Sequence, residues 1–233
     1  PFTGFTRYFA ISTKVPPLDN IHCRNAVEYA TDKVALQTAR GGANAGGAIA
    51  TSMLPPNILG HDDSIDPFNT KSGKPQVDKA KQELQQCGHP DGFTTSIATT
   101  NTGKGPKTAE ALQQALAQVG IKATIAPSDA SAYYRTTIGS PTNVKAKGYG
   151  LMVAGWGADF PTAYGFDQVL VDGRAIKPSG NNNYAELSDP QIDKLIDNVM
   201  KRFGRLDILI NDAAYNKAIP FKDLDGLTTE EWS

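Results

Sequence analysis

The order of hydrophobic and polar positions along the chain predicts strands and helices in alternation. Residues 7–13 (RYFAIST) are rich in aromatic and β-branched side chains, which is typical of a strand. From residue 21 to 38 the apolar positions recur at helical spacing and stop at a glycine pair, so we predict a helix there. Residues 77–87 predict an amphipathic helix that Gly88 ends.

The same alternation continues through the second half of the chain. Residues 93–99 predict a strand, 107–119 a helix, and 121–125 a strand with alternating side chains. A further helix follows up to about residue 138, and residues 151–154 (LMVA) form the short apolar run that a buried strand needs. Strands and helices that alternate at this spacing predict an α/β domain with a layered sheet.

The segment after this last strand, residues 155–161 (GWGADFP), carries candidate chemistry. Gly155 and Gly157 permit close approach of the backbone, and the strand would deliver Trp156 and the Asp159 carboxylate to its own carboxyl end. In α/β sheets that end is where ligands are usually bound. The structural alternative is that Asp159 caps a turn and Trp156 belongs to the core.

This segment resembles the G-W-x-A-D-Y-P motif of the extracellular solute-binding proteins of family 5, the peptide-binding receptors of ABC importers. The P-P-L-D-N turn at 16–20, the helix after it, the L-P-P loop at 54–56 and the passage from 79 to 93 are similar to that family too. The resemblance covers residues 1 to about 197 and implies a periplasmic-binding-protein-like lobe (type II, family 5) with a layered sheet and flanking helices.

The resemblance also implies roles for particular residues. Asp159 would meet the ammonium group of the ligand, and Trp156 would be an aromatic ring of the pocket. An asparagine-rich piece at 180–184 would lie at the ligand cleft, although a plain turn is an equally simple interpretation because Asn tolerates left-handed backbone. Leu187 departs from the family, since many members have an aromatic residue there. The implied ligand-binding residues are Gly155, Trp156, Gly157, Asp159, Asn182 and Asn183.

The function implied by the resemblance is binding without catalysis. The chain would be a peptide-binding lobe of an extracellular, membrane-associated receptor of the lipoprotein kind, with no cofactor. Its partners would be a short peptide or related small solute, the importer's membrane subunits, and an amino-terminal lobe that has no counterpart in this chain. Because the family closes two lobes over its ligand, we expect this chain alone to bind peptides weakly.

Composition and charge argue against a nucleic-acid or anionic-membrane partner. The chain has 233 residues, a net charge of −1 and 39% hydrophobic residues, enough for one large or two small cores. A near-neutral balance argues against nucleic acid as a partner. No apolar run approaches the roughly twenty residues that span a bilayer. The start lacks the charged and apolar regions of a signal peptide, so we expect a processed chain or part of a longer one.

Cysteine and metal-ligand spacing predict no metal site. Cys23 and Cys87 have no second ligand at C-x-x-C or C-x-H spacing. They would pair in an exported protein and stay as buried thiols in a cytosolic one; the family resemblance favours pairing. His61, Asp62 and Asp63 could hold a hard cation together with Asp66, but a solvated acidic turn is the favoured interpretation. The glycine-rich segments at 41–47 and 103–108 do not fit phosphate-binding loops; we predict a loop and a helix-entry turn, respectively.

The resemblance changes near Asn198. Residues 202–214 (RFGRLDILINDAA) resemble the strand and N-N-A-G motif of short-chain dehydrogenases/reductases, and we expect residues 198–233 to be a segment rather than an independent domain. The G-x-x-x-G-x-G cofactor loop of that family is absent, and the Tyr29/Lys33 pair precedes the motif instead of following it. The alternatives to a receptor lobe are therefore an NAD(P)-dependent dehydrogenase fragment or an inert chimeric fragment.

Overall fold

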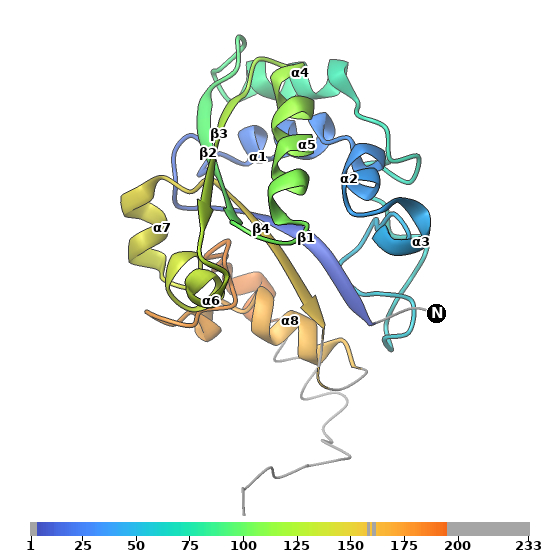
Figure 1. Cartoon of the computed structure of the whole chain (residues 1–233), viewed down its shortest axis with the longest axis vertical. Coiled ribbons are helices and arrows are strands. Elements are labelled where there is room, and N and C mark those ends of the chain that lie inside the picture. Colours follow the sequence, from blue (N-terminus) through green and yellow to red (C-terminus); the bar gives the residue numbers. More distant parts are fainter. Residues whose placement is uncertain (1–3, 158, 160–161, 195–233) are drawn as a thin grey trace, which may run out of the picture. The chain divides into compact units, whose positions relative to one another are not determined.

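The computed structural model describes residues 4–157, 159 and 162–194. Its elements, coloured along the chain in Figure 1, are β1 (Phe5–Ile11), α1 (Ile21–Ala30), α2 (Lys33–Ala39), α3 (Gly42–Gly46), α4 (Val77–Gln86), β2 (Thr94–Thr100), α5 (Gly105–Ala117), β3 (Lys122–Ser128), α6 (Ala130–Ala132), η1 (Tyr133–Thr137), α7 (Pro141–Lys147), β4 (Leu151–Gly157), α8 (Tyr164–Leu170) and η2 (Gly173–Ala175). The predicted seam at Asn198 and the dehydrogenase-like segment lie outside the described residues, so both stay predictions.

The strands form one mixed sheet in the order β1-β4-β2-β3. β2, α5 and β3 make a parallel βαβ unit, in which Thr94 pairs with Lys122 and Thr100 with Ser128. β4 then joins the other edge of β2, in parallel, and β1 pairs with β4 in antiparallel orientation. The connection from β2 leads to β3 on one edge of β2, and the next connection brings β4 to the opposite edge. The direction in which strands are added to the sheet therefore reverses between β2 and β4. The predicted α/β fold class is confirmed.

The apolar run at 151–154 is buried because β4 packs on both faces. Leu151 and Val153 belong to the core between the sheet and the helices α1, α4 and α5. Met152 and Ala154 belong to a second core on the other face, with Tyr133 of η1 among its members. Successive side chains of a strand point to opposite faces, so an internal strand covered on both sides needs an unbroken apolar sequence. Figure 1 shows α5 in front of the sheet, with β4 and β1 crossing behind it.

The helix predicted over 21–38 is in fact two helices, so that prediction was wrong. Thr31 is extended, with φ −69° and ψ 125°, and ends α1. The Asp32 side chain then accepts a hydrogen bond from the Ala35 amide at 2.8 Å and caps α2. A side chain that satisfies a free helix-terminal amide makes a new helix start favourable within an otherwise continuous helical pattern. The glycine-rich segment that we predicted as a loop includes the short helix α3.

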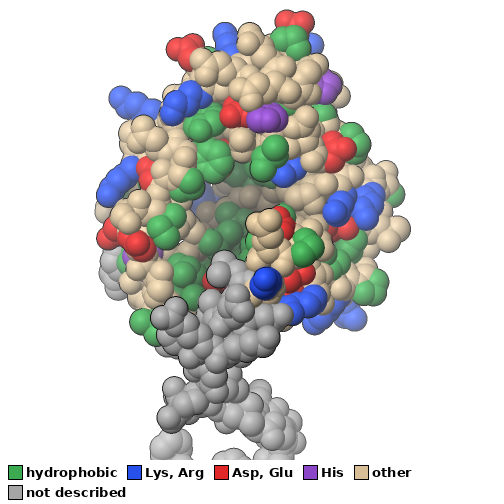
Figure 2. Space-filling view, turned by 180° about the vertical axis from the view of Figure 1, so that it is seen from behind, with side chains coloured by type: hydrophobic (Ala, Val, Ile, Leu, Met, Phe, Trp, Pro, Cys, Tyr) green, Lys and Arg blue, Asp and Glu red, His purple; other side chains and the backbone are tan. Residues whose placement is uncertain are grey.

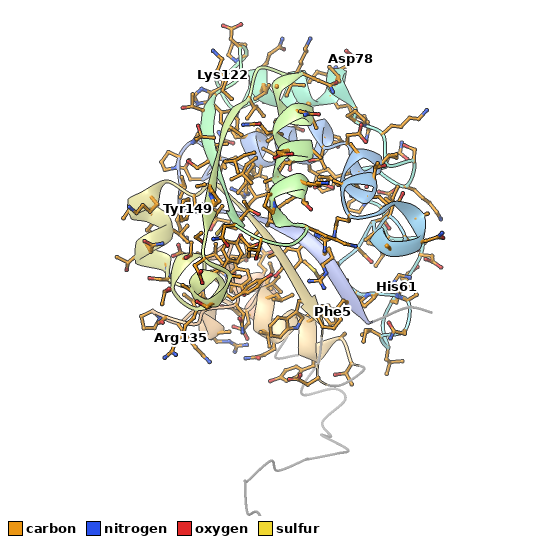
Figure 3. The ribbon with its side chains drawn as sticks, in the orientation of Figure 1. Phe5, His61, Asp78, Lys122, Arg135 and Tyr149 are labelled. Carbon is orange, nitrogen blue, oxygen red and sulfur yellow. A yellow bond between two sulfur atoms is a disulfide. The ribbon has the colours of Figure 1, made fainter. Side chains whose placement is uncertain are left out.

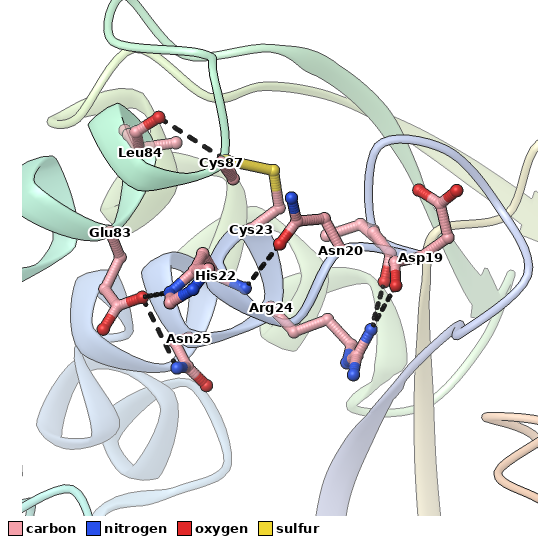
Figure 4. The surroundings of a disulfide bond; sticks show 10 residues. Asp19, Asn20, His22, Cys23, Arg24, Asn25, Glu83, Leu84 and Cys87 are labelled. Atoms are coloured by element: carbon pink, nitrogen blue, oxygen red, sulfur yellow. Dashed lines mark hydrogen bonds and ion pairs between the residues drawn. A yellow bond between two sulfur atoms is a disulfide. The ribbon is translucent and has the colours of Figure 1, made fainter.

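A disulfide joins the helical layer. Cys23 on α1 and Cys87 directly after α4 are bonded, and their Cα atoms lie 5.4 Å apart (Figure 4). Beside the bond, Glu83 accepts hydrogen bonds from the His22 ring at 2.7 Å and from the Asn25 amide at 3.4 Å. The disulfide and these contacts hold α1 and α4 together over one face of the sheet. Among the described residues, no helix is both long and apolar enough to cross a membrane.

Candidate functional site

β2 and β4 separate toward their carboxyl ends, and this separation creates the candidate site. The two strands pair at Ile97 with Leu151 and at Ala98 with Met152, and their pairing stops there. The fully buried Tyr133 places its hydroxyl 2.8 Å from the carbonyl oxygens of both Ala98 and Val153, so one phenol bridges the diverging strands. Carboxyl ends of parallel strands at a reversal of connection are the general place for ligands in α/β sheets.

A cavity of about 220 Å³ lies at this separation, and we call it the fork cavity. Its lining comes from strands, helix ends and a loop that are distant in sequence, and includes Arg7, Arg40, Thr100, Lys104, Tyr134 and Val153. A second hollow, of about 340 Å³, lies near the amino end of β2 and is lined by threonine, serine and small residues without a titratable side chain. The fork cavity is therefore the better candidate for chemical recognition, although it is smaller.

The glycines of β4 make room for side chains of β1. Arg7 pairs with Gly155 and Phe5 with Gly157 in the antiparallel register. A Cβ at Gly155 would lie 2.5 Å from Nη1 of Arg7, and a Cβ at Gly157 would lie 2.8 Å from the Phe5 ring. The Arg7 guanidinium also lies over the Phe5 ring, 5.1 Å from its centroid. The groups that lie close to these glycines are thus side chains of β1, and one of them, the Arg7 guanidinium, lines the fork cavity.

Trp156 lies on the other face of the sheet from Arg7, because neighbours along a strand alternate. Its indole N–H donates to the carbonyl oxygen of Gly165 at 2.8 Å, and its half-buried ring packs on the cluster around Phe166 and Leu170 of α8. Asp159 follows β4 and is exposed. No hydrogen bond or ion pair of the Asp159 carboxylate is found within the described part of the chain. The structure therefore keeps Trp156 in contact with α8 and leaves Asp159 open to solvent.

The predicted asparagines lie in a tightly hydrogen-bonded loop. Asn183 is fully buried; its amide donates to the carbonyl oxygens of Leu187 at 2.8 Å and Asp172 at 3.3 Å, and its side-chain oxygen accepts from the Leu187 amide at 3.0 Å. Asn182 is half-buried, and its side-chain oxygen accepts a 3.4 Å hydrogen bond from the hydroxyl of Tyr184. Neither asparagine lines either of the two hollows described above.

Sequence analysis missed Arg7, Arg40, Lys104 and Tyr134. Arg7 is an outward position of a strand, and Arg40 is the residue that ends α2, where a cation is unremarkable. The sequence predicts a helix-entry turn at Lys104, and α5 does begin at Gly105. Each residue is ordinary in its local pattern, and only their convergence on the fork cavity distinguishes them.

Comparison with known proteins decides the family. The profile of bacterial extracellular solute-binding proteins, family 5 (Middle), matches residues 3–177, well over half of the chain. The chain belongs to this family. A glutathione-binding protein, GsiB, of Pectobacterium atrosepticum is 30% identical over 204 residues, a match that covers 86% of this chain and 37% of that protein. GsiB of Escherichia coli K12 is 32% identical over 157 residues, covering 65% of this chain and 28% of that protein.

Solved structures agree with this assignment. The clavulanic acid biosynthesis oligopeptide binding protein 2 has a TM-score of 0.81 and 43% identity, covering 86% of this chain and 36% of that one. A dipeptide binding protein from Pseudoalteromonas sp. SM9913, in complex with Met-Leu, has a TM-score of 0.68 and 26% identity, covering 88% and 38%. The chain spans less than two fifths of the length of these relatives. Family 5 proteins are described as extracellular, and the dehydrogenase-like resemblance of 202–214 lies beyond the matched residues.

Proposed function

We propose that this chain is a ligand-binding lobe of the solute receptor of an ABC importer, which binds a peptide-like solute without catalysis. The match of residues 3–177 to family 5 carries the proposal. Relatives named for glutathione, oligopeptide and dipeptide binding support a short peptide or peptide-like solute. Its further partners would be the importer's membrane subunits and a second lobe that closes over the solute.

Asp159 is the proposed partner of the solute's ammonium group. It follows the carboxyl end of β4, is exposed, and has no ion pair within the described part of the chain. Gly155, Trp156 and Gly157 would shape this end of the strand, and Asn182 and Asn183 would border the cleft. A charge-assisted hydrogen bond to a carboxylate contributes about 1.5–3 kcal/mol, or roughly tenfold to 150-fold in affinity.

The proposed location is outside the cytoplasm, at the cell surface. The disulfide between Cys23 and Cys87 supports this, because disulfides persist in oxidising compartments and are rare where thiols are kept reduced. On the face drawn in Figure 2, acidic and basic side chains of the described residues are interspersed. Such a mixed surface is expected of a protein that binds small solutes, whereas nucleic-acid binding needs a basic face.

An NMR titration of the ¹⁵N-labelled chain tests the proposal, because it detects dissociation constants in the millimolar range. The probes are alanylalanine, glutathione and N-acetylalanylalanine, which lacks the ammonium group. We expect the first two to shift signals around β4, and Asp159→Asn to abolish this binding. The control Asp91→Asn changes an exposed carboxylate in the turn before β2 and should leave binding intact. Equal binding of the acetylated peptide, or no effect of Asp159→Asn, would contradict the proposed role of Asp159.

A further inference from the structure

The fork cavity is lined by positive charge that no carboxylate offsets. Arg7 comes from β1, Arg40 from the end of α2, and Lys104 from the residue before α5. Among the described residues, none of these side chains has an ion pair with Asp or Glu, and no acidic residue lines the cavity. Cations gathered around a concave, partly desolvated space create a field that attracts anions.

The positive charge of Arg7 disfavours the charged form of the Arg40 guanidinium. The pKa of Arg40 is lowered, first by burial and next by the nearby positive charge of Arg7. Arg40 is held in place by a 3.3 Å hydrogen bond from Nη1 to the hydroxyl of Thr108 on α5. Two like charges held near each other raise the energy of the unliganded state, although water around the exposed Arg7 weakens their repulsion. A bound anion between them would remove that cost.

Polar groups around the cations also favour an oxygen-rich anion. Lys104, which lines the cavity, donates hydrogen bonds to the carbonyl oxygens of Arg40 and Ala45. Beneath Gly105, the fully buried hydroxyl of Thr99 has no hydrogen-bond partner within the described part of the chain. A Cβ at Gly105 would lie 2.7 Å from that hydroxyl oxygen, so the hydroxyl lies directly under the cavity lining. Guanidinium groups bind carboxylates through paired N–H donors.

We propose that the fork cavity is an acid-binding subsite, in which Arg7 and Arg40, assisted by Lys104, bind a side-chain carboxylate of the solute. The inference rests on the proposed function for the solute class and extends it. With three cations at the cavity and Asp159 as the proposed anion, a solute with more carboxylates than ammonium groups fits the charge best. A cavity of about 220 Å³ has room for a carboxylate and its methylene stem, since one water occupies about 30 Å³ of liquid. The chain thus selects acidic peptide-like solutes over neutral ones.

The test compares alanylglutamate with alanylglutamine, which have the same shape and differ by one negative charge. We expect the chain to bind alanylglutamate about tenfold more tightly. Arg7→Gln and Arg40→Gln should each remove most of this preference. Lys122→Gln is the matched control, because Figure 3 places Lys122 at the opposite end of the sheet from Phe5, the neighbour of Arg7. Urea unfolding of each variant shows whether it has kept its fold.

A third probe separates this inference from the role of Asp159. N-acetylglutamate has carboxylates but no ammonium, and it should shift the Nε–H signals of Arg7 and Arg40 in NMR spectra even in Asp159→Asn. If that shift occurs while Asp159→Asn leaves alanylglutamate binding unchanged, the acid-binding subsite stands and the proposed ammonium partner is wrong. Equal affinity of the reference chain for alanylglutamate and alanylglutamine overturns the inference. So does a preference that folded Arg7→Gln and Arg40→Gln variants retain.

Discussion

The side chain of Arg7 lies across the Cα of Gly155, its partner on the neighbouring strand. The relationship depends on a missing side chain, because a Cβ at Gly155 would lie 2.5 Å from Nη1 and 2.8 Å from Cδ of Arg7. Real Cβ atoms do not approach other atoms so closely, so the arginine would have to move. A glycine in the family motif therefore determines where a cation of another strand is placed.

Gly155→Ala should reduce the preference for alanylglutamate over alanylglutamine to about the level of Arg7→Gln, a loss of about tenfold. The added methyl group displaces the arginine side chain from the fork cavity. The effect is measured by comparing the binding of alanylglutamate and alanylglutamine, as for the arginine variants. Lys122→Gln is again the control, because Lys122 lies at the opposite end of the sheet from Phe5, which the Arg7 guanidinium covers. Unchanged selectivity in a folded Gly155→Ala protein would show that Arg7 reaches the cavity from another position.

Tyr133→Phe should destabilise the chain by about 1–3 kcal/mol. The substitution removes the hydroxyl that bridges Ala98 and Val153 and leaves buried carbonyl oxygens without their donor. Tyr8→Phe is the internal comparison, because the buried Tyr8 hydroxyl has no partner within the described residues. Its removal should be neutral or stabilising. Urea denaturation of both variants measures their free energies of unfolding. If Tyr8→Phe lowers the free energy of unfolding as much as Tyr133→Phe does, the hydrogen bonds of the Tyr133 hydroxyl do not stabilise the fold as proposed.

Reduction of the disulfide should lower the free energy of unfolding by about 4 kcal/mol. The bond closes a loop between residues 64 apart in sequence, and chain-entropy theory gives this cost for a loop of that length. Urea unfolding with and without a phosphine reductant measures it, and Cys23→Ala/Cys87→Ala should match the reduced chain. The prediction fails if thiol titration shows complete reduction while the unfolding midpoint stays where it was.

Asp172 should make stability depend on pH in the acid range. The buried carboxylate accepts hydrogen bonds from Nη2 of Arg174 at 2.7 Å and from the Arg174 amide at 2.8 Å, and these lower the pKa of Asp172 below its ordinary value. A folded pKa below the unfolded one contributes stability that is complete above the unfolded value, about 4, and is lost as pH falls through the folded value.

Asp172→Asn should therefore cost about 1–3 kcal/mol at pH 7, and the gap from the unaltered chain should narrow as pH falls below about 4. Urea denaturation at a series of pH values between neutral and the acid limit of folding tests this. A gap that stays constant with pH would mean that the carboxylate contributes through packing or neutral hydrogen bonds rather than through its charge.

The order of elements could be predicted from sequence because it depends on short-range chemistry. The strand at 151–154, the helix starting near Val77 and the helix-entry turn at Lys104 follow from hydrophobic periodicity and local turn residues. The division of the helix at 21–38 was missed, because a capping aspartate within a helical pattern looks like any polar position. The break appears only when the backbone at Thr31 is extended and Asp32 accepts from the Ala35 amide.

The sequence by itself determined the fold class, the family and the strand that contains Trp156 and precedes Asp159, since the patterns that indicate them lie in contiguous residues. The tertiary structure decided the rest of the candidate site. β4 joins β2 on the side away from β3, the two strands diverge after Ala98, and Arg7, Arg40 and Lys104 meet at the separation. The alternation of side chains along β4 turns Trp156 toward α8, on the face opposite Arg7. Such convergence depends on contacts between segments far apart in the chain, which local periodicity does not encode.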